Sequence, residues 1–236
     1  MPFFLKGELF TRVIFMTGYN RGDSYERVIF EIFQQKGLLS SNSTRAGAGG
    51  GPDIRFIHNT LENRLEVKLD LRADYGQKML KWKNGIWTWC VDDPTTKFYT
   101  EVGVLDIIAS KNIIHNRYII PKHEITTEHK QVDQKIFEDS IDVDIRALYS
   151  YYSHKNCYYI QIGGYGFYHL ETDILGLGTP KFNCQMNLRL RAKTIHSIPI
   201  YKYGFYAVLK IKPQPITKSI YDLEEKEGRL FPPILI

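Results

Sequence analysis

The sequence lacks the patterns that mark several large classes of protein. No apolar run reaches the 18 residues of a membrane-spanning helix, and Lys6, Glu8 and Arg12 interrupt the apolar character of residues 1–16. We therefore expect neither a membrane span nor a signal peptide. The histidines form no HExxH or HxxxH pair, and neither a GxSxG motif nor a Gly-Lys-Ser/Thr phosphate loop occurs. These absences argue against zinc or serine hydrolysis and against a nucleotide cofactor.

Cysteine is scarce, and no charge strongly dominates. The three cysteines (Cys90, Cys157 and Cys184) are too far apart for a zinc site or a disulfide framework, so we expect reduced thiols in a cytoplasmic protein. Lys and Arg number 31 against 26 Asp and Glu, which gives a formal net charge of +5. This mild excess is compatible with a polyanionic partner but does not identify one.

The most informative stretch is 49–70, GGGPDIRFIHNTLENRLEVKLD. Apolar and charged side chains alternate from residue 65 to residue 70, which is typical of a strand with one face on the core. A shorter alternating run precedes it, and the polar residues between the two runs are typical of a turn. If the runs pair as a hairpin, Asp53 lies opposite Glu66 and Lys68.

Two carboxylates beside a lysine have the chemistry needed for metal-assisted hydrolysis of a phosphodiester, because carboxylates bind hard cations and the lysine orients water. The pattern acid-x-Lys occurs four times in the chain, so alone it is not specific. Only the copy at Glu66 and Lys68 lies in an alternating apolar run after a Pro-Asp pair. The alternative interpretation is an ordinary charge pair on a solvent-facing sheet surface.

Pro52, Asp53, Glu66 and Lys68 resemble the motif of the PD-(D/E)XK nuclease family, whose type II restriction endonucleases are its best-known members. The match covers about twenty residues at the spacing of the family. The resemblance implies that Asp53 and Glu66 bind a metal ion and that Lys68 acts on the attacking water. It also implies Mg²⁺ as cofactor, with Mn²⁺ as a substitute.

Residues 23–36 have apolar side chains at helical spacing, with Asp23 or Ser24 as cap, and are predicted to form an amphipathic helix that ends at Gly37. Similar nucleases carry a glutamate on an N-terminal helix near the metal, and Glu26 fits that place. The resemblance thus suggests Glu26 as a further metal ligand and site residue. An ordinary surface glutamate is the alternative.

The segment after the lysine, 72–82, is predicted to turn into a helix. Gln77 lies where similar nucleases place a glutamine after the catalytic strand, so the resemblance adds it to the site. A polar residue on an exposed helix face is the alternative interpretation.

A loop of glycine and alanine, 46–51, stands directly before Asp53. Glycines allow another backbone to approach closely, and we expect Gly49, Gly50 and Gly51 to contact DNA. A flexible linker is the alternative interpretation.

Residues 186–193 alternate so that Arg189, Arg191 and Lys193 share one face of a predicted strand. Like charges in a row repel unless a polyanion or acidic groups oppose them. We predict contact with DNA, since arginine also makes bidentate contacts to guanine. A sheet edge guarded by positive charge is the alternative.

The remaining pattern indicates an α/β fold with a mixed central β-sheet flanked by helices and a strand-rich C-terminal elaboration. Residues 81–90 predict a hairpin around Asn84-Gly85, whose tryptophans we expect mainly to pack, and 105–120 predict a helix or a strand. An exposed connection with a short helix is expected over 126–144, and strands over 158–162 and 204–212. We expect a single domain over 1–236, with 1–110 as the catalytic core and 111–236 contributing DNA recognition and dimerisation.

These observations lead to the hypothesis of a type II restriction endonuclease-like enzyme. It would hydrolyse double-stranded DNA at a specific sequence, with Mg²⁺, as a homodimer matching a palindromic site. One alternative is a repair, recombination or structure-specific nuclease of the same fold. Another is a DNA-binding module without catalysis, although carboxylates without metal would repel phosphate.

Overall fold

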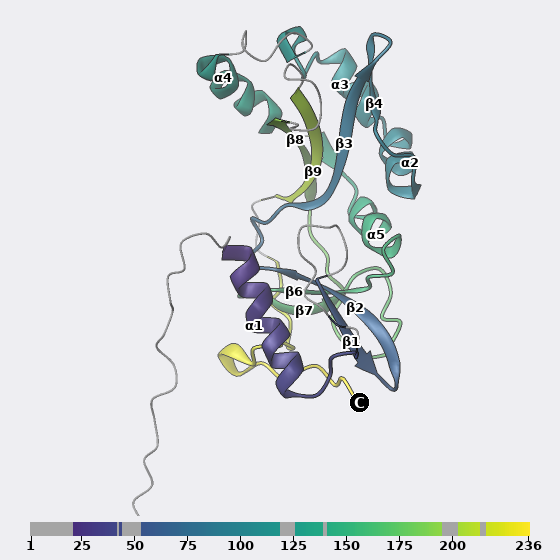
Figure 1. Ribbon diagram of the computed structural model, residues 1–236, viewed down its shortest axis with the longest axis vertical. Helices are drawn as coiled ribbons and strands as arrows, with labels where there is room; N and C mark the ends of the chain where they lie inside the picture. Colours follow the sequence, from purple (N-terminus) through teal and green to yellow (C-terminus); the bar gives the residue numbers. More distant parts are fainter. Residues whose placement is uncertain are drawn as a thin grey trace, which may run out of the picture.

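The computed structural model describes residues 21–41, 43, 53–118, 126–138, 141–194, 203–212 and 216–236. Helices and strands alternate in these ranges, so the α/β class predicted from the sequence is correct. In place of one central sheet there are two, and Figure 1 shows them one above the other along the long axis of the molecule.

The helices are α1 (Arg21–Gln35), α2 (Pro94–Glu101), α3 (Val104–Ser110), α4 (Thr127–Glu138) and α5 (Arg146–Ser153), with short 3-10 turns η1 (Asn116–Tyr118) and η3 (Lys226–Gly228). The strands are β1 (Ile54–His58), β2 (Leu61–Lys68), β3 (Tyr75–Lys83), β4 (Ile86–Trp89), β5 (Ile141–Val143), β6 (Tyr159–Ile162), β7 (Gly166–His169), β8 (Met186–Thr194) and β9 (Tyr203–Ile211).

The lower sheet has the strand order β1-β2-β6-β7, and β2 and β6 run parallel while the outer pairs are antiparallel. Helix α1 packs on one face of this sheet because Tyr25, Ile29 and Phe33 form a buried stripe at helical spacing. The helix predicted over 23–36 is confirmed, but the predicted cap is wrong: α1 begins at Arg21, so Asp23 and Ser24 lie inside its first turn.

The upper sheet is antiparallel throughout, with the order β4-β3-β9-β8-β5. The predicted hairpin over 81–90 is confirmed: Asn84 and Gly85 both have left-handed backbones, with φ of 52° and 81°. Trp87 packs edge-on against Trp82 and against Phe205, each at 5.3 Å between ring centroids. Packing within the sheet therefore accounts for these two tryptophans.

The helix predicted over 72–82 is wrong, because this segment forms β3. Gln, Lys, Met and Leu favour a helix locally, yet Gly76 has a φ of 44° that no helix allows. Pairing with β9 on one side and β4 on the other supplies the backbone partners that a helix would have supplied. Tertiary pairing thus outweighs local propensity.

The other predicted elements agree with the structure in kind. The segment predicted as helix or strand over 105–120 contains most of α3 together with η1, and 126–144 contains α4 and β5. The strands predicted over 158–162, 186–193 and 204–212 correspond to β6, β8 and β9.

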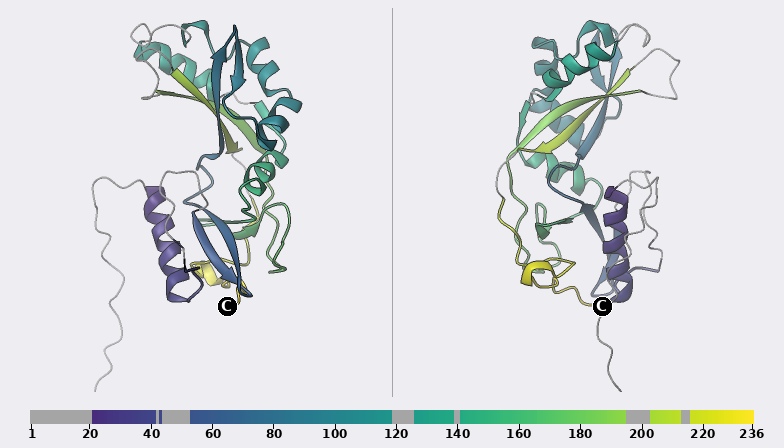
Figure 2. Two further views of the ribbon diagram at one scale, coloured as in Figure 1. Left: turned by 45° about the vertical axis from the view of Figure 1, so that its right-hand side comes forward. Right: turned by 90° about the vertical axis from the view of Figure 1, so that its left-hand side faces the viewer.

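Both sheets combine strands from the two halves of the chain. β2 pairs with β6 in the lower sheet and β3 pairs with β9 in the upper one, so a boundary near residue 110 follows neither sheet. Helix α5 lies between the levels of the two sheets, as the views in Figures 1 and 2 agree. It is therefore in a position to contact both.

The C-terminal segment 216–236 lies against the lower sheet. The N–H of Phe167 in β7 donates to the carbonyl of Tyr221 at 2.8 Å. Deeper inside, the Gln161 amide of β6 donates to Asp222, which also forms a 2.7 Å ion pair with Arg229. Asp222 is fully buried, so this network fixes the segment to the centre of the sheet.

Candidate active site

The hairpin of β1 and β2 brings the predicted site residues together. Asn59 and Thr60 form its two-residue turn with φ of 49° and 67°, which matches the twist of the strands. The register pairs Ile54 with Leu65, so Asp53, one residue before β1, lies next to Glu66. The predicted hairpin is confirmed.

Strand alternation then sorts the side chains of β2 between two faces. Leu65 and Val67 point toward α1, while Glu66 and Lys68 point toward α5. The Lys68 Nζ lies 2.6 Å from Glu66 Oε1, and Asp53 Oδ2 accepts a 2.7 Å hydrogen bond from the Val67 N–H. Asp53, Glu66 and Lys68 therefore share one end of the lower sheet.

This position is not a solvent-facing sheet surface. Only 6% of Glu66 is exposed, and 19% of the Lys68 side chain. An ordinary surface charge pair remains solvated, whereas these groups have lost most of their water. The alternative of a solvated Glu66–Lys68 pair therefore does not fit the structure.

The site holds more negative charge than its lysine balances. Burial and the Glu66 carboxylate raise the pKa of Asp53 to about 8, although Lys68 and the Val67 N–H act in the opposite direction. Glu26 also raises it, to a smaller extent. Asp53 thus lies where a further cation would stabilise its charged form.

Lys68 stays protonated in this setting. Burial lowers the pKa of Lys68, but the carboxylates of Glu66 and Asp53 outweigh burial and hold that pKa above its ordinary value. The ammonium also lies 5.8 Å from the centre of the Tyr75 ring. Lys68 is therefore a source of positive charge and hydrogen bonds, and it cannot serve as a base near neutral pH.

Tyr152 completes the surroundings of Glu66, although no sequence pattern pointed to it. Its hydroxyl, carried by α5, donates to Glu66 Oε1 at 3.0 Å. Burial and the Glu66 carboxylate raise the pKa of the Tyr152 phenol well above its ordinary value. Helical spacing predicts which face of α5 is buried, but no pattern links Tyr152 to a strand so far away in the chain.

One oxygen of each carboxylate remains available to a ligand. Both donors to Glu66 meet Oε1, and the donor to Asp53 meets Oδ2. Within the described ranges, neither Glu66 Oε2 nor Asp53 Oδ1 receives a hydrogen bond or ion pair. Two carboxylate oxygens plus water suit Mg²⁺, which commonly binds through one or two carboxylates.

Glu26 lies on α1, partly buried, and acts on Asp53 electrostatically. The described part of the chain has no group of three or more His, Cys, Asp or Glu side chains placed to hold a metal. Glu26 is thus not grouped with Asp53 and Glu66 as a third ligand in this conformation.

The sequence also predicts Gln77 and the glycines before Asp53 as site residues. Gln77 is exposed on β3, at the bulge between Tyr75 and Lys78, and not on a helix as predicted. Gly49, Gly50 and Gly51 lie outside the residues that the structure describes.

The cationic face of β8 has an acidic partner. Arg189 lies 2.8 Å from Asp74 Oδ1, and Arg191 lies 2.8 Å from Asp74 Oδ2. The Lys210 ammonium lies 3.2 Å from Asp74 Oδ1. Burial alone would raise the pKa of Asp74, but Arg189 and Lys210 outweigh it and hold that pKa below its usual range. Lys193 belongs to the same strand, but its side chain lies outside the described part. Asp74 therefore links cations from β8 and β9.

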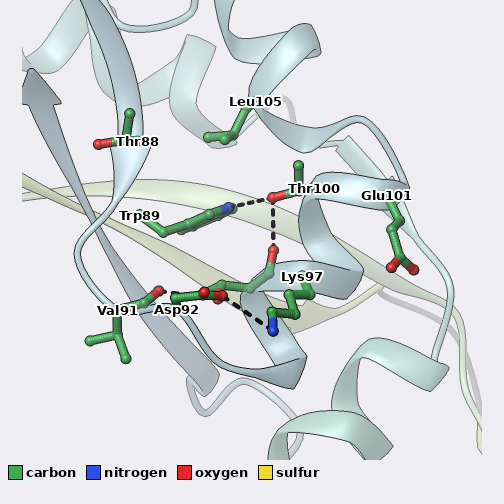
Figure 3. A pocket seen from close by; sticks show the side chains of 9 residues that line it. Thr88, Trp89, Val91, Asp92, Lys97, Thr100, Glu101 and Leu105 are labelled. Carbon is green, nitrogen blue, oxygen red and sulfur yellow. Dashed lines mark hydrogen bonds and ion pairs between the residues drawn. The ribbon is translucent and has the colours of Figure 1, made fainter. Parts of the chain in front are cut away.

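A surface depression lies away from these residues, between β4, α2 and α3. Figure 3 shows its lining, in which Trp89 Nε1 donates to the Thr100 hydroxyl at 2.9 Å and Lys97 faces Asp92. The polar end of Trp89 is thus bound within the protein, and packing accounts for the third tryptophan also.

Comparison of the chain with protein-family models, with curated proteins and with solved structures gives no significant match. Among the described residues, every helix is too short or too polar to span a membrane.

Proposed function

We propose that this chain is a Mg²⁺-dependent endonuclease of the restriction type, acting on double-stranded DNA. The observation that carries the proposal is the meeting of Asp53, Glu66 and Lys68 in a buried site with an available oxygen on each carboxylate. The net positive charge of +5 and the cationic side chains of β8 suit a polyanionic substrate.

Asp53 and Glu66 would hold the ion, because their oxygens are hard ligands and their charge exceeds that of Lys68. When bound, a divalent ion supplies Lewis-acid stabilisation of charge on the cleaved phosphate. Mn²⁺ has similar ligand preferences and would substitute. Glu26 would contribute only if α1 or the side chain moved closer.

The residues of the chain have separate tasks in this proposal. Glu66 fixes the Lys68 ammonium through the 2.6 Å ion pair. Lys68 then orients the attacking water and offsets negative charge that builds on the phosphate. Since Lys68 remains protonated, the proton of the water leaves to solvent or to the phosphate itself and not to the lysine.

The direct test incubates the protein with a long DNA duplex and Mg²⁺. Discrete fragments support sequence-specific cleavage, a smear supports a non-specific or structure-specific nuclease, and intact DNA favours a binding module. Cleavage should stop in excess chelator, and Ca²⁺ should support binding without turnover. Undiminished cleavage in chelator would contradict the proposal.

Lys68→Ala should lose cleavage by orders of magnitude and still bind the target, because Lys68 acts on the transition state. Lys81→Ala is the matched control, since Lys81 is an exposed lysine of β3. Rates of cleavage and gel-shift affinities of both variants, compared with the wild type, make the measurement. Normal cleavage by Lys68→Ala would remove this residue from the site.

We include a homodimer in the proposal, because a two-fold pair of sites matches the two strands of a palindrome. Light scattering after gel filtration, with and without a cleavable duplex, measures the mass. A monomer in both states would contradict this part alone.

A further inference from the structure

We propose that Tyr152 is a positioning residue that holds Glu66 in the orientation needed to bind the metal ion. This inference rests on the proposed function and extends it to a residue of α5 that has no counterpart in the sequence motif.

The contact is buried and specific. Tyr152 is 1% exposed, and its hydroxyl donates to Glu66 Oε1 at 3.0 Å. Lys68 Nζ meets the same oxygen at 2.6 Å. Two donors from different elements thus fix one oxygen of Glu66, and the carboxylate plane can no longer rotate freely.

The consequence concerns the other oxygen. Within the described ranges Glu66 Oε2 receives no hydrogen bond or ion pair, so it is the oxygen that can serve as a ligand. Lys68 alone would not stop the Glu66 carboxylate from rotating, because the long and flexible lysine side chain could move with it. Tyr152 cannot follow, because its ring packs at 5.1 Å against Tyr151 inside the protein. The Tyr152 hydroxyl therefore sets the orientation of the Glu66 carboxylate.

Tyr149 on the same helix shows what a structural tyrosine looks like here. It is 5% exposed, and its hydroxyl donates to the main-chain carbonyl of Phe182 at 2.7 Å. The two tyrosines thus each make one buried hydrogen bond, but only that of Tyr152 ends on a carboxylate of the site. Comparing them separates the loss of a buried hydrogen bond from the loss of positioning.

The experiment compares Tyr152→Phe with Tyr149→Phe in the full chain. Binding of Mn²⁺ is measured by calorimetry, unfolding by thermal melts, and cleavage of duplex DNA at saturating metal. Removing an outer partner of a metal ligand weakens metal affinity or activity by about 10–100-fold. We expect that loss for Tyr152→Phe and unchanged Mn²⁺ affinity for Tyr149→Phe, with comparable losses of stability.

A second variant tests whether Tyr152 acts through Glu66. Glu66→Asp shortens the side chain by one methylene and should break the contact, so adding Tyr152→Phe should weaken Mn²⁺ binding no further. Equal Mn²⁺ affinity of Tyr152→Phe and the wild type would overturn the inference while leaving the proposed function intact. A wild type that neither binds Mn²⁺ nor cleaves DNA would overturn both.

Discussion

Asp53 illustrates how a buried carboxylate without a matching cation destabilises a protein. Its carboxylate lies beside Glu66 in a place where burial has removed most of the water, and Lys68 balances only one of the two charges. Burying a carboxylate without full compensation is unfavourable, so the protonated form is preferred in the metal-free protein.

This preference predicts how stability depends on pH in the presence of a chelator. The pKa of Asp53 is about 8 in the folded protein and about 3.9 when unfolded, so folding favours the protonated form. That stabilisation is complete below pH 4 and is lost as the pH rises through 8. Asp53→Asn removes this contribution to the pH dependence of stability. The variant should therefore have a higher melting temperature than the wild type at pH 9, but not at pH 5.

Thermal melts at pH 5 and pH 9, with chelator and then with saturating Mg²⁺, measure this effect. Mg²⁺ should raise the melting temperature of the wild type at pH 9 and not that of Asp53→Asn. Asp92→Asn is the control, since its carboxylate is exposed. A wild type and an Asp53→Asn variant with parallel pH profiles would contradict the prediction.

At the level of residues, the sequence predicted what depends on local pattern. Alternation around a polar turn, predicted over residues 59–63, indicated that Asp53, Glu66 and Lys68 lie together. The turn itself is shorter, Asn59-Thr60, because Leu61 and Asn63 already pair within the hairpin. Tyr152 and Asp74 could not be found in this way. Their partners lie on strands distant in sequence, and only the folded chain determines which helix face meets which strand.

Among the elements, β8 holds its two arginine side chains in a fixed arrangement. Asp74 holds Arg189 and Arg191 side by side, and exposure then distinguishes them: 25% of the Arg189 side chain is accessible against 47% of Arg191. If this face meets DNA, Arg191 is better placed to reach it. Arg189 contributes more to holding Asp74.

We therefore predict a larger loss of DNA affinity for Arg191→Ala than for Arg189→Ala. A contact to a base edge should cost about 1–3 kcal/mol on the cognate duplex only. A phosphate contact should weaken binding to all duplexes and reduce the salt dependence by about one unit. Affinities for cognate and non-cognate duplexes at two salt concentrations separate these cases, with the exposed Lys97→Ala as control.

Unchanged affinity of both arginine variants for both duplexes would identify β8 as a strand guarded by positive charge, without a role in DNA binding.

Strand β8 also shows the limit of sequence patterns, since alternation predicted the shared face of the arginines but not their acidic partner. In β3, by contrast, local propensity gave the wrong element, because pairing with β9 and β4 decided its conformation.

At the scale of the whole molecule, the N-terminal and C-terminal halves of the chain meet at the end of β2, next to Lys68. The N–H of Gly163, just after β6, donates to the Lys68 carbonyl at 2.9 Å. A Cβ at Gly163 would lie 2.2 Å from the carbonyl oxygen of Leu69, which no side chain can do without displacing the backbone. This glycine therefore permits the close approach on which the position of Lys68 depends.

Gly163→Ala should destabilise the protein by about 1–3 kcal/mol, as overpacking does, and should also lower the rate of DNA cleavage. Gly164→Ala is the matched control in the same turn: its φ of 76° strains an alanine, but its Cβ would meet no atom within 4 Å. We expect Gly164→Ala to lose stability and keep its cleavage rate. Urea unfolding and cleavage rates measure both, and a Gly163→Ala variant with the wild-type cleavage rate would contradict the prediction.

The sequence also predicted the α/β class and most elements, but not their division into two sheets. That division depends on pairings such as β2 with β6, in which the partners come from opposite halves of the chain. Parallel strands have no turn between them to fix a register, so no local signal marks the pairing.

The parallel pairing of β2 with β6 has a consequence for synthesis on the ribosome. At about 5–20 residues per second, roughly 5–20 s pass between the emergence of β2 and that of β6. During that time Asp53, Glu66 and Lys68 exist on a nascent chain without α5, Gln161 or the segment that closes over the lower sheet. A nascent or prematurely ended chain therefore carries the whole motif but not the structure that surrounds it, and the proposed activity must wait until β6 and the C-terminal segment are made.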